Sequence, residues 1–144
     1  MNLRKAISLP LAVAFALLAG CANDAPQPPD LTLDGWSWVW TKTTYNNDTE
    51  ITPRDPAAFT ATFIEDGHFQ ATTDCNSLRG TYELDGNKLI FGQMASTRMA
   101  CPDSQEQAFT GMLAEVQTHL LTDAGQLVLA LKYDTGSMVF EVVE

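Results

Sequence analysis

Hydrophobic and polar residues alternate over several short segments of the chain, which is the pattern of β-strands buried on one face. In the first of these segments, Trp36, Trp38 and Trp40 occupy every second position. An Asp-Gly dipeptide separates the second segment from the third, and another separates the fourth from the fifth, so two β-hairpins are expected. The expected strands comprise residues 33–40, 59–63, 68–72, 80–84, 87–91, 126–131 and 137–142.

One segment between the strands has a helical period instead. Its apolar residues recur three or four positions apart, at Phe109, Met112, Leu113, Val116 and Leu120. Asp103 is the predicted N-cap of this helix, with Glu106 in capping-box spacing. The apolar stripe is expected to pack on the sheet. The pattern therefore predicts a single α+β domain, a mostly antiparallel β-sheet covered by one amphipathic α-helix.

The first residues have the organisation of a bacterial lipoprotein signal peptide. Arg4 and Lys5 precede an apolar run over residues 6–18 that is too short for a permanent membrane span. The run ends in Leu-Ala-Gly-Cys, which resembles a lipobox with Cys21 as the lipidated residue, carrying palmitate and other acyl chains. The alternative is a plain secreted protein with an unmodified Cys21.

The expected domains are therefore a signal peptide over residues 1–20, a flexible proline-containing tether over residues 21–30, and one folded domain over residues 31–144. Ala22 follows the cysteine, and by analogy with lipoprotein sorting this favours the outer membrane, facing the periplasm, in a Gram-negative host.

The charge of the chain excludes some partners. The formal net charge is -10, and loss of Arg4 and Lys5 with the signal peptide would change it to -12. So acidic a domain is not expected to bind nucleic acid by neutralising phosphates, and anionic lipid headgroups repel it. The membrane is therefore expected to be a partner through the N-terminal lipid and not through charge.

The pattern of specific residues resembles the META domain family, which includes the HslJ-like lipoproteins of bacteria. The most specific match is Thr97-Arg98-Met99-Ala100-Cys101 at this distance from Cys75-Asn76. Further matching residues are Trp36, Trp38, Phe63, Gly67, Gly80, Tyr82, Leu89, Phe91, Glu106, Phe109, Leu113 and Phe140. The chain departs from the family pattern at Asp74, where glycine is usual and would suggest a positive φ angle or a close backbone approach. Asp tolerates the left-handed conformation better than most residues.

The resemblance implies a small envelope module associated with tolerance of heat or of novobiocin-type antibiotics. The compact sheet of this family has been compared with the pilot lipoproteins that escort secretin subunits. The resemblance implies no catalytic mechanism and no cofactor.

Cys75 and Cys101 are the two cysteines of the expected mature domain besides Cys21. A signal peptide places them in an oxidising compartment, where such a pair normally forms a disulfide. Two alternatives remain open: a metal site with His68 and His119, which lacks closely spaced ligand pairs, and a reactive thiol.

Asn76, Thr97 and Arg98 flank these cysteines and form a possible binding patch for an envelope partner. The alternative is structural: Asn76 and Thr97 cap turns, and Arg98 covers an aromatic ring or pairs with a carboxylate.

The expected function is that of a non-enzymatic, lipid-anchored envelope protein that contributes to stress tolerance by binding an envelope component. No defensible serine, histidine and acid pattern supports a hydrolase. The alternative is a pilot- or chaperone-like carrier for a hydrophobic peptide or acyl chain. A cavity lined by Trp36, Trp38 and residues 127–131 would favour the carrier, and a filled core would favour surface binding.

Overall fold

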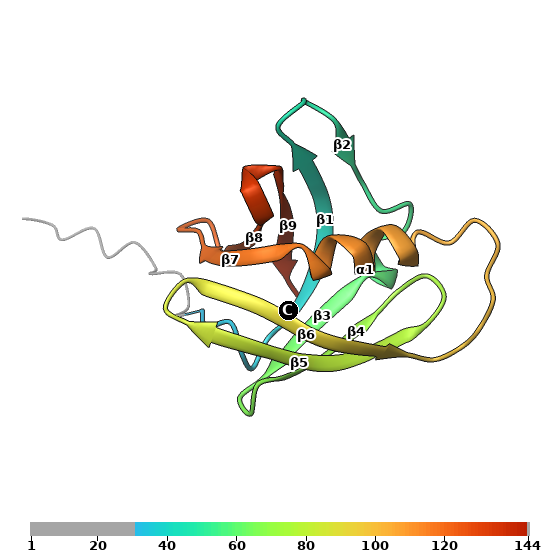
Figure 1. The fold of residues 1–144 in the computed structure, drawn as a ribbon, viewed down its shortest axis with the longest axis horizontal. Helices are drawn as coiled ribbons and strands as arrows, with labels where there is room; N and C mark the ends of the chain where they lie inside the picture. The colour runs from blue at the N-terminus through green and yellow to red at the C-terminus, as the bar shows by residue number, and fades with distance from the viewer. Residues whose placement is uncertain (1–30, 144) are drawn as a thin grey trace, which may run out of the picture.

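The computed structural model describes residues 31–143, which form one mostly antiparallel β-sheet and one α-helix (Figure 1). Cys21, the expected signal peptide and the expected tether lie outside the described residues. The strands are β1 (Ser37–Tyr45), β2 (Glu50–Ile51), β3 (Thr60–Ile64), β4 (His68–Thr72), β5 (Ser77–Asp85), β6 (Lys88–Ser96), β7 (Val116–Leu121), β8 (Gln126–Leu131) and β9 (Gly136–Val142). The helix is α1 (Glu106–Ala114), and short 3₁₀ turns η1 (Pro56–Ala58) and η2 (Lys132–Asp134) connect strands.

The sheet closes on itself because β1 pairs with β9. The strand order is β2-β1-β3-β4-β5-β6-β7-β8-β9, and antiparallel pairing of β1 with β9 joins the two ends. One edge of β1 follows β9 from Trp38 to Tyr45, while its other edge pairs first with β3 and then with the short β2. Closure leaves every strand with an inner face, so the alternating apolar residues of all strands meet in one core.

The closed sheet has one weak seam, between β6 and β7. A single pair of residues, Lys88 and Thr118, is in register there. Beyond this point β6 contains a bulge, since Gly80 pairs with Met94 but Tyr82 pairs with Phe91, two residues of β6 for one of β5. Because a bulge bends its strand, the second half of β6 diverges from β7, and α1 lies beside it (Figure 1).

The helix contributes its apolar side to the core of the sheet. Phe109 is fully buried, and its ring centroid lies 5.4 Å from that of Trp40 and 5.3 Å from that of Phe59. Phe140 of β9 is 6.4 Å away. Aromatic pairs at these distances add stabilisation beyond the area they bury. A nine-residue helix is too short to be stable alone, so its packing against these rings holds it in place.

Several expected strands are confirmed, and β4 and β8 have the predicted bounds. The helix is shorter than its apolar stripe predicted, because Val116 already pairs with Leu131 as part of β7. Leu120 consequently lies on the outer side of a strand and is 61% exposed. The predicted N-cap was also wrong: Asp103 has a φ angle of 64°, whereas an N-cap residue normally has an extended backbone, and the helix begins after Gln105.

The tryptophan segment is confirmed as a strand with one change. Trp38 and Trp40 are fully buried, but the strand starts at Ser37, so Trp36 precedes it and packs only partly against the core. The strand also continues to Tyr45, into a polar stretch that lacks apolar alternation. Thr43 is buried there because its hydroxyl accepts a hydrogen bond from the indole N–H of Trp40, at 3.0 Å. No helix within residues 31–143 is long and apolar enough to cross a membrane.

Replacing Phe109 with alanine tests the contribution of the helix to the core. The Phe109→Ala variant should lower the free energy of unfolding by about 3 to 5 kcal/mol, because it removes a fully buried ring and leaves a cavity. Urea denaturation measures this change. Gln107→Ala, at an exposed position of the same helix, is the control and should change the stability by less than about 0.5 kcal/mol. Equal losses in the two variants would contradict the assignment of the core to one side of α1.

Candidate functional site

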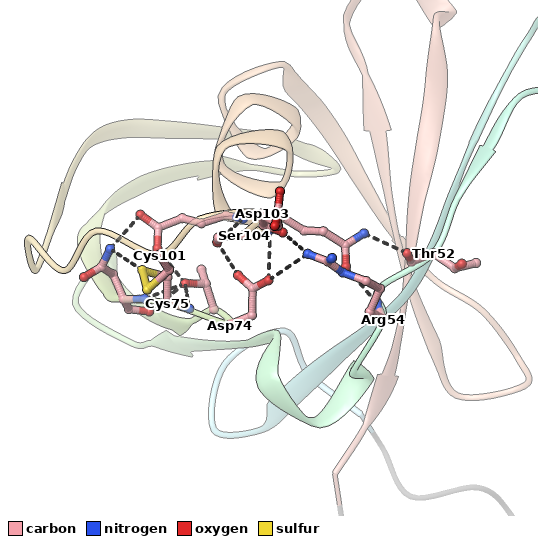
Figure 2. A network of polar contacts seen from close by, with 11 residues as sticks. Thr52, Arg54, Asp74, Cys75, Cys101, Asp103 and Ser104 are labelled. Carbon is pink, nitrogen blue, oxygen red and sulfur yellow. Dashed lines mark hydrogen bonds and ion pairs between the residues drawn. A yellow bond between two sulfur atoms is a disulfide. The ribbon is translucent and has the colours of Figure 1, made fainter.

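The two stretches that carry the family-specific residues meet at the start of α1 (Figure 2). The β5–β6 hairpin separates them in sequence, and a disulfide joins Cys75 to Cys101 with an S–S distance of 2.05 Å and a Cα–Cα distance of 5.8 Å. The expected disulfide is therefore present in the structure. The metal site is contradicted, because bonded sulfurs do not ligate a metal as thiolates, and the described residues contain no cluster of three metal-binding side chains.

Asn76 is the polar centre of this junction. Its side-chain Oδ1 accepts hydrogen bonds from the Thr97 hydroxyl and from the backbone N–H of Met99, each at 2.8 Å. Its Nδ2 donates to the Met99 carbonyl at 3.1 Å and to Glu106 Oε1 at 3.2 Å. An amide side chain offers two donors and two acceptor positions, so the side chain of Asn76, in a residue only 8% exposed, is fully used within the protein.

Glu106, the first residue of α1, connects the junction to the helix. Its Oε2 lies 2.7 Å from the hydroxyl of Thr73, and that hydroxyl accepts the backbone N–H groups of Cys75 and Asn76. One carboxylate therefore holds both ends of the turn between β4 and β5. The turn, the disulfide and the helix start form a single hydrogen-bonded unit, which supports the structural interpretation of Asn76 and Thr97.

Asp74 caps the helix from outside its own segment. Its carboxylate accepts the backbone N–H of Gln105 at 2.9 Å and the hydroxyl of Ser104, while Ser104 Oγ accepts the N–H of Glu106 at 3.0 Å. The first backbone N–H groups of a helix need such partners, and a negative charge there is favoured by the helix dipole. Asp74 does not have the positive φ angle that a glycine would suggest, and its side chain has this capping role instead.

Arg54 extends the cluster towards Thr52 in the loop after β2 (Figure 2), and hydrogen bonds of Gln105 join this loop to the helix start. The Gln105 side chain accepts the N–H of Arg54 at 2.8 Å and donates to the carbonyl of Thr52 at 3.0 Å. The guanidinium of Arg54 lies 3.8 Å from Asp74 Oδ2 and also donates to the carbonyl of Asp103. These contacts attach the loop after β2 to the start of the helix. Since Arg54 is well exposed, its ion pair with Asp74 contributes little energy.

The environment of Asp74 lowers its pKa below the usual value of 3.8. Partial burial alone would raise this pKa, but the hydrogen bonds from Ser104 and Gln105 and the charge of Arg54 together outweigh it. His119, at a distance from this cluster on β7, has a pKa lowered by burial and partly restored by the carbonyl of Asn87, 3.2 Å from its Nδ1.

Arg98 differs from the other two residues of the expected binding patch. The Asn76 side chain and the Thr97 hydroxyl are hydrogen-bonded to each other, although Thr97 as a residue is exposed. Arg98 is exposed and belongs to none of the ion pairs between described residues. Its neighbour Met99 is 63% exposed although its backbone is bound to Asn76. Arg98 and Met99 are therefore the large side chains that this segment presents at the surface.

Three contributors to the site were missed by sequence reasoning: Arg54, Ser104 and Gln105. Their contacts span up to 53 residues in the chain, and none of them stands in a local motif with Asp74. The one available signal was the acidic residue at a position where the family usually has glycine.

Comparisons with known proteins agree with the fold and its characteristic residues. The family model described as META domain matches residues 29–142. An NMR structure of a protein from Burkholderia xenovorans superposes with a TM-score of 0.65 at 27% identity, covering 95% of this chain and 98% of that chain. A crystal structure of a DUF4847 family protein from Bacteroides vulgatus ATCC 8482 has a TM-score of 0.58 at 16% identity, covering 76% of this chain and 93% of that chain, and shows the fold alone. No curated protein matches the chain.

Removal of the disulfide should destabilise the domain. The bond joins two cysteines with a sequence separation of 26, and in the chain-entropy model a bond that closes such a loop contributes about 3 to 4 kcal/mol. The Cys75→Ser/Cys101→Ser double variant should therefore have a lower melting temperature than the parent and should be insensitive to reductant. Thermal denaturation with and without dithiothreitol measures both properties. Equal melting temperatures for variant and oxidised parent would contradict this contribution.

Capping by Asp74 should make part of the stability depend on pH. The pKa of Asp74 is lower in the folded protein than the value of 3.8 expected in the unfolded chain. The contribution of Asp74 to the free energy of unfolding is therefore fully present above pH 3.8 and is lost as the pH falls through the folded pKa. At neutral pH, Asp74→Ala should lower the free energy of unfolding by about 0.5 to 2 kcal/mol.

Urea denaturation of parent and Asp74→Ala between neutral pH and pH values below 3.8 measures this dependence. The difference between the two proteins should shrink as the pH falls below that value. Glu83→Ala, at an exposed position on β5, is the control and should show no comparable difference at neutral pH. A difference for Asp74→Ala that stays constant down to the lowest pH would exclude the charged cap.

Proposed function

Because the chain belongs to the META domain family, we propose that it is a non-enzymatic, lipid-anchored envelope protein that acts by binding another envelope component. The observation that carries this proposal is the hydrogen bonding of the Asn76 side chain. This buried amide has all its donors and acceptors bound to protein atoms, so it offers nothing to a substrate. Asn76 and the disulfide thus hold the segment of residues 97–101 in place, and this segment presents Arg98 and Met99 at the surface.

The proposed anchor is the lipid on Cys21, supported by the apolar run and small residues that precede this cysteine. Ala22 favours sorting to the outer membrane, with the domain in the periplasm. The proposed role in tolerance of heat or of novobiocin-type drugs rests on the resemblance to HslJ-like proteins. An oxidising compartment is consistent with the Cys75–Cys101 disulfide.

The alternative carrier function is less well supported. It was expected to use a cavity against Trp36, Trp38 and the strand from Leu127 to Leu131. Trp38, Leu127 and Leu129 have no accessible surface at all, which leaves no space for a ligand against these three side chains. This packing favours binding at the outer surface over transport of a hydrophobic peptide or acyl chain in the core.

Complementation of a deletion strain tests the function. The intact chain should restore growth under heat or novobiocin, and mass spectrometry of membranes should find acyl chains on Cys21. Arg98→Ala should fold normally, with an unchanged melting temperature, but fail to restore growth. Lys88→Ala, which alters an exposed lysine at the start of β6, is the matched control and should complement. An unmodified Cys21, or full complementation by Arg98→Ala, would overturn the proposal.

A further inference from the structure

A hollow opens on the outer face of β3, β4 and β5, on the side of the sheet away from the core. Its volume is about 430 Å³, and its lining includes the exposed residues Ile64, His68, Gln70, Arg79 and Thr81. Strand register places Ile64, His68 and Thr81 in one row across the sheet, and Gln70 and Arg79 in the next. Pockets of this size hold small organic ligands. The hollow is therefore a candidate ligand site outside the filled core.

Two polar head groups in this hollow have no partner among the described residues. Gln70 of β4 and Arg79 of β5 lie opposite each other, and neither side chain takes part in a hydrogen bond or ion pair between described residues. The nearby hydroxyls differ, since those of Thr60 and Thr72 lie 2.7 Å apart and Thr72 donates to the carbonyl of Ala58. A guanidinium has five N–H donors and an amide has two. These unused donors match an oxyanion.

The charges around these donors favour an anion and determine where it binds. None of the described residues that line the hollow is acidic, although 18 residues of the chain are Asp or Glu. Glu65 and Asp66 follow Ile64 in the turn between β3 and β4, and Glu83 follows Thr81 on β5. These three carboxylates repel an anion from the Ile64 end of the hollow. An anion is therefore bound at the Arg79 end.

The Ile64 end of the hollow suits an apolar group. Ile64 is a large hydrophobic residue that is 37% exposed, and the stems of Gln70 and Arg79 are apolar up to their head groups. Ile64 and Arg79 are two strands and two residues apart. At a strand spacing of about 4.8 Å and a rise of about 3.3 Å per residue, this separation is roughly 12 Å. The matching ligand has an acidic group at one end and an apolar body of several carbons.

We propose that this outer hollow binds a small amphiphilic carboxylic acid, with its carboxylate on Arg79 and Gln70 and its apolar body against Ile64. A guanidinium binds a carboxylate through two parallel hydrogen bonds. A phosphate monoester also accepts such bonds, but it carries more negative charge, and a chain with a net charge of -10 repels it more strongly. This inference goes beyond the proposed function, because Arg98 is not part of the hollow.

Amide NMR spectra of the purified full-length chain during titration with octanoate test the proposal. Octanoate should shift the amide signals of Gln70, Arg79 and Thr81, and the shifts should saturate. Octanamide has the same apolar body without the charge, and octyl phosphate has the same body with a higher charge. Both should bind more weakly than octanoate.

Three variants separate the contributions of the guanidinium and of the apolar body. Arg79→Ala should weaken octanoate binding roughly three- to tenfold, as for an exposed charge-assisted contact, and should affect octanamide less. Lys88→Ala removes the same charge at an exposed position outside the hollow and should bind octanoate like the parent. Ile64→Thr keeps the branched shape but removes apolar surface, so it should weaken binding of octanoate and octanamide alike by about two- to fourfold.

Absence of saturable shifts at the three amides would overturn the proposal, as would octanamide or octyl phosphate that binds as tightly as octanoate. Equal weakening by Arg79→Ala and Lys88→Ala would also overturn it, because the effect would then follow the net charge and not this guanidinium. The amide spectrum of each variant reports whether it folds. Complementation by the Arg98 variant is scored separately, so the envelope function and the ligand site can fail independently.

Discussion

Pairing of the first long strand with the last is the constraint on which the rest of the structure depends. The hydrogen bonds between β1 and β9 close the sheet and give all its strands a common interior, where Trp38, Trp40 and Phe140 are fully buried. The ring of Phe109 completes this interior by packing against Trp40, Phe59 and Phe140. The short helix is thus held by the sheet, and the sheet core is completed by the helix.

The position of the helix determines the chemistry at its first turn. Its unpaired N–H groups would be costly if left without partners, and they are bound by Asp74 and Ser104. The neighbouring carboxylate of Glu106 holds Asn76 and Thr73, which in turn order the disulfide-bonded segment. The side chains of Thr73, Asn76 and Glu106 are hydrogen-bonded to one another within this junction. The segment that reaches the surface is bound through the N–H of Met99 and the disulfide, and it exposes the side chains of Arg98 and Met99.

The same arrangement explains why β6 is paired along its whole length on one side only. The bulge at Gly92 and Gln93 turns the strand away from β7, and the chain then enters the disulfide-bonded segment instead of continuing the sheet. On this side of the strand lies α1, which begins at the Asn76 junction and leads into β7. The junction around Asn76 therefore holds the end of β6, and with it the exposed residues Arg98 and Met99, in place.

Much of this architecture follows from local sequence pattern, and the remainder from contacts between distant residues. Alternation of apolar residues determined the hairpins, since side chains of a strand point to opposite faces whatever their surroundings. The cysteine count predicted the disulfide, and Glu106 and Phe109 were placed on the helix. The end of the helix at Ala114, the capping by Asp74 and the closure of β1 on β9 were decided only by the tertiary structure. Each of these features depends on a partner 15 to nearly 100 residues away in the chain. The pairs are Val116 with Leu131, Asp74 with Gln105, and Thr41 with Val139. Local periodicity carries no information about such pairs.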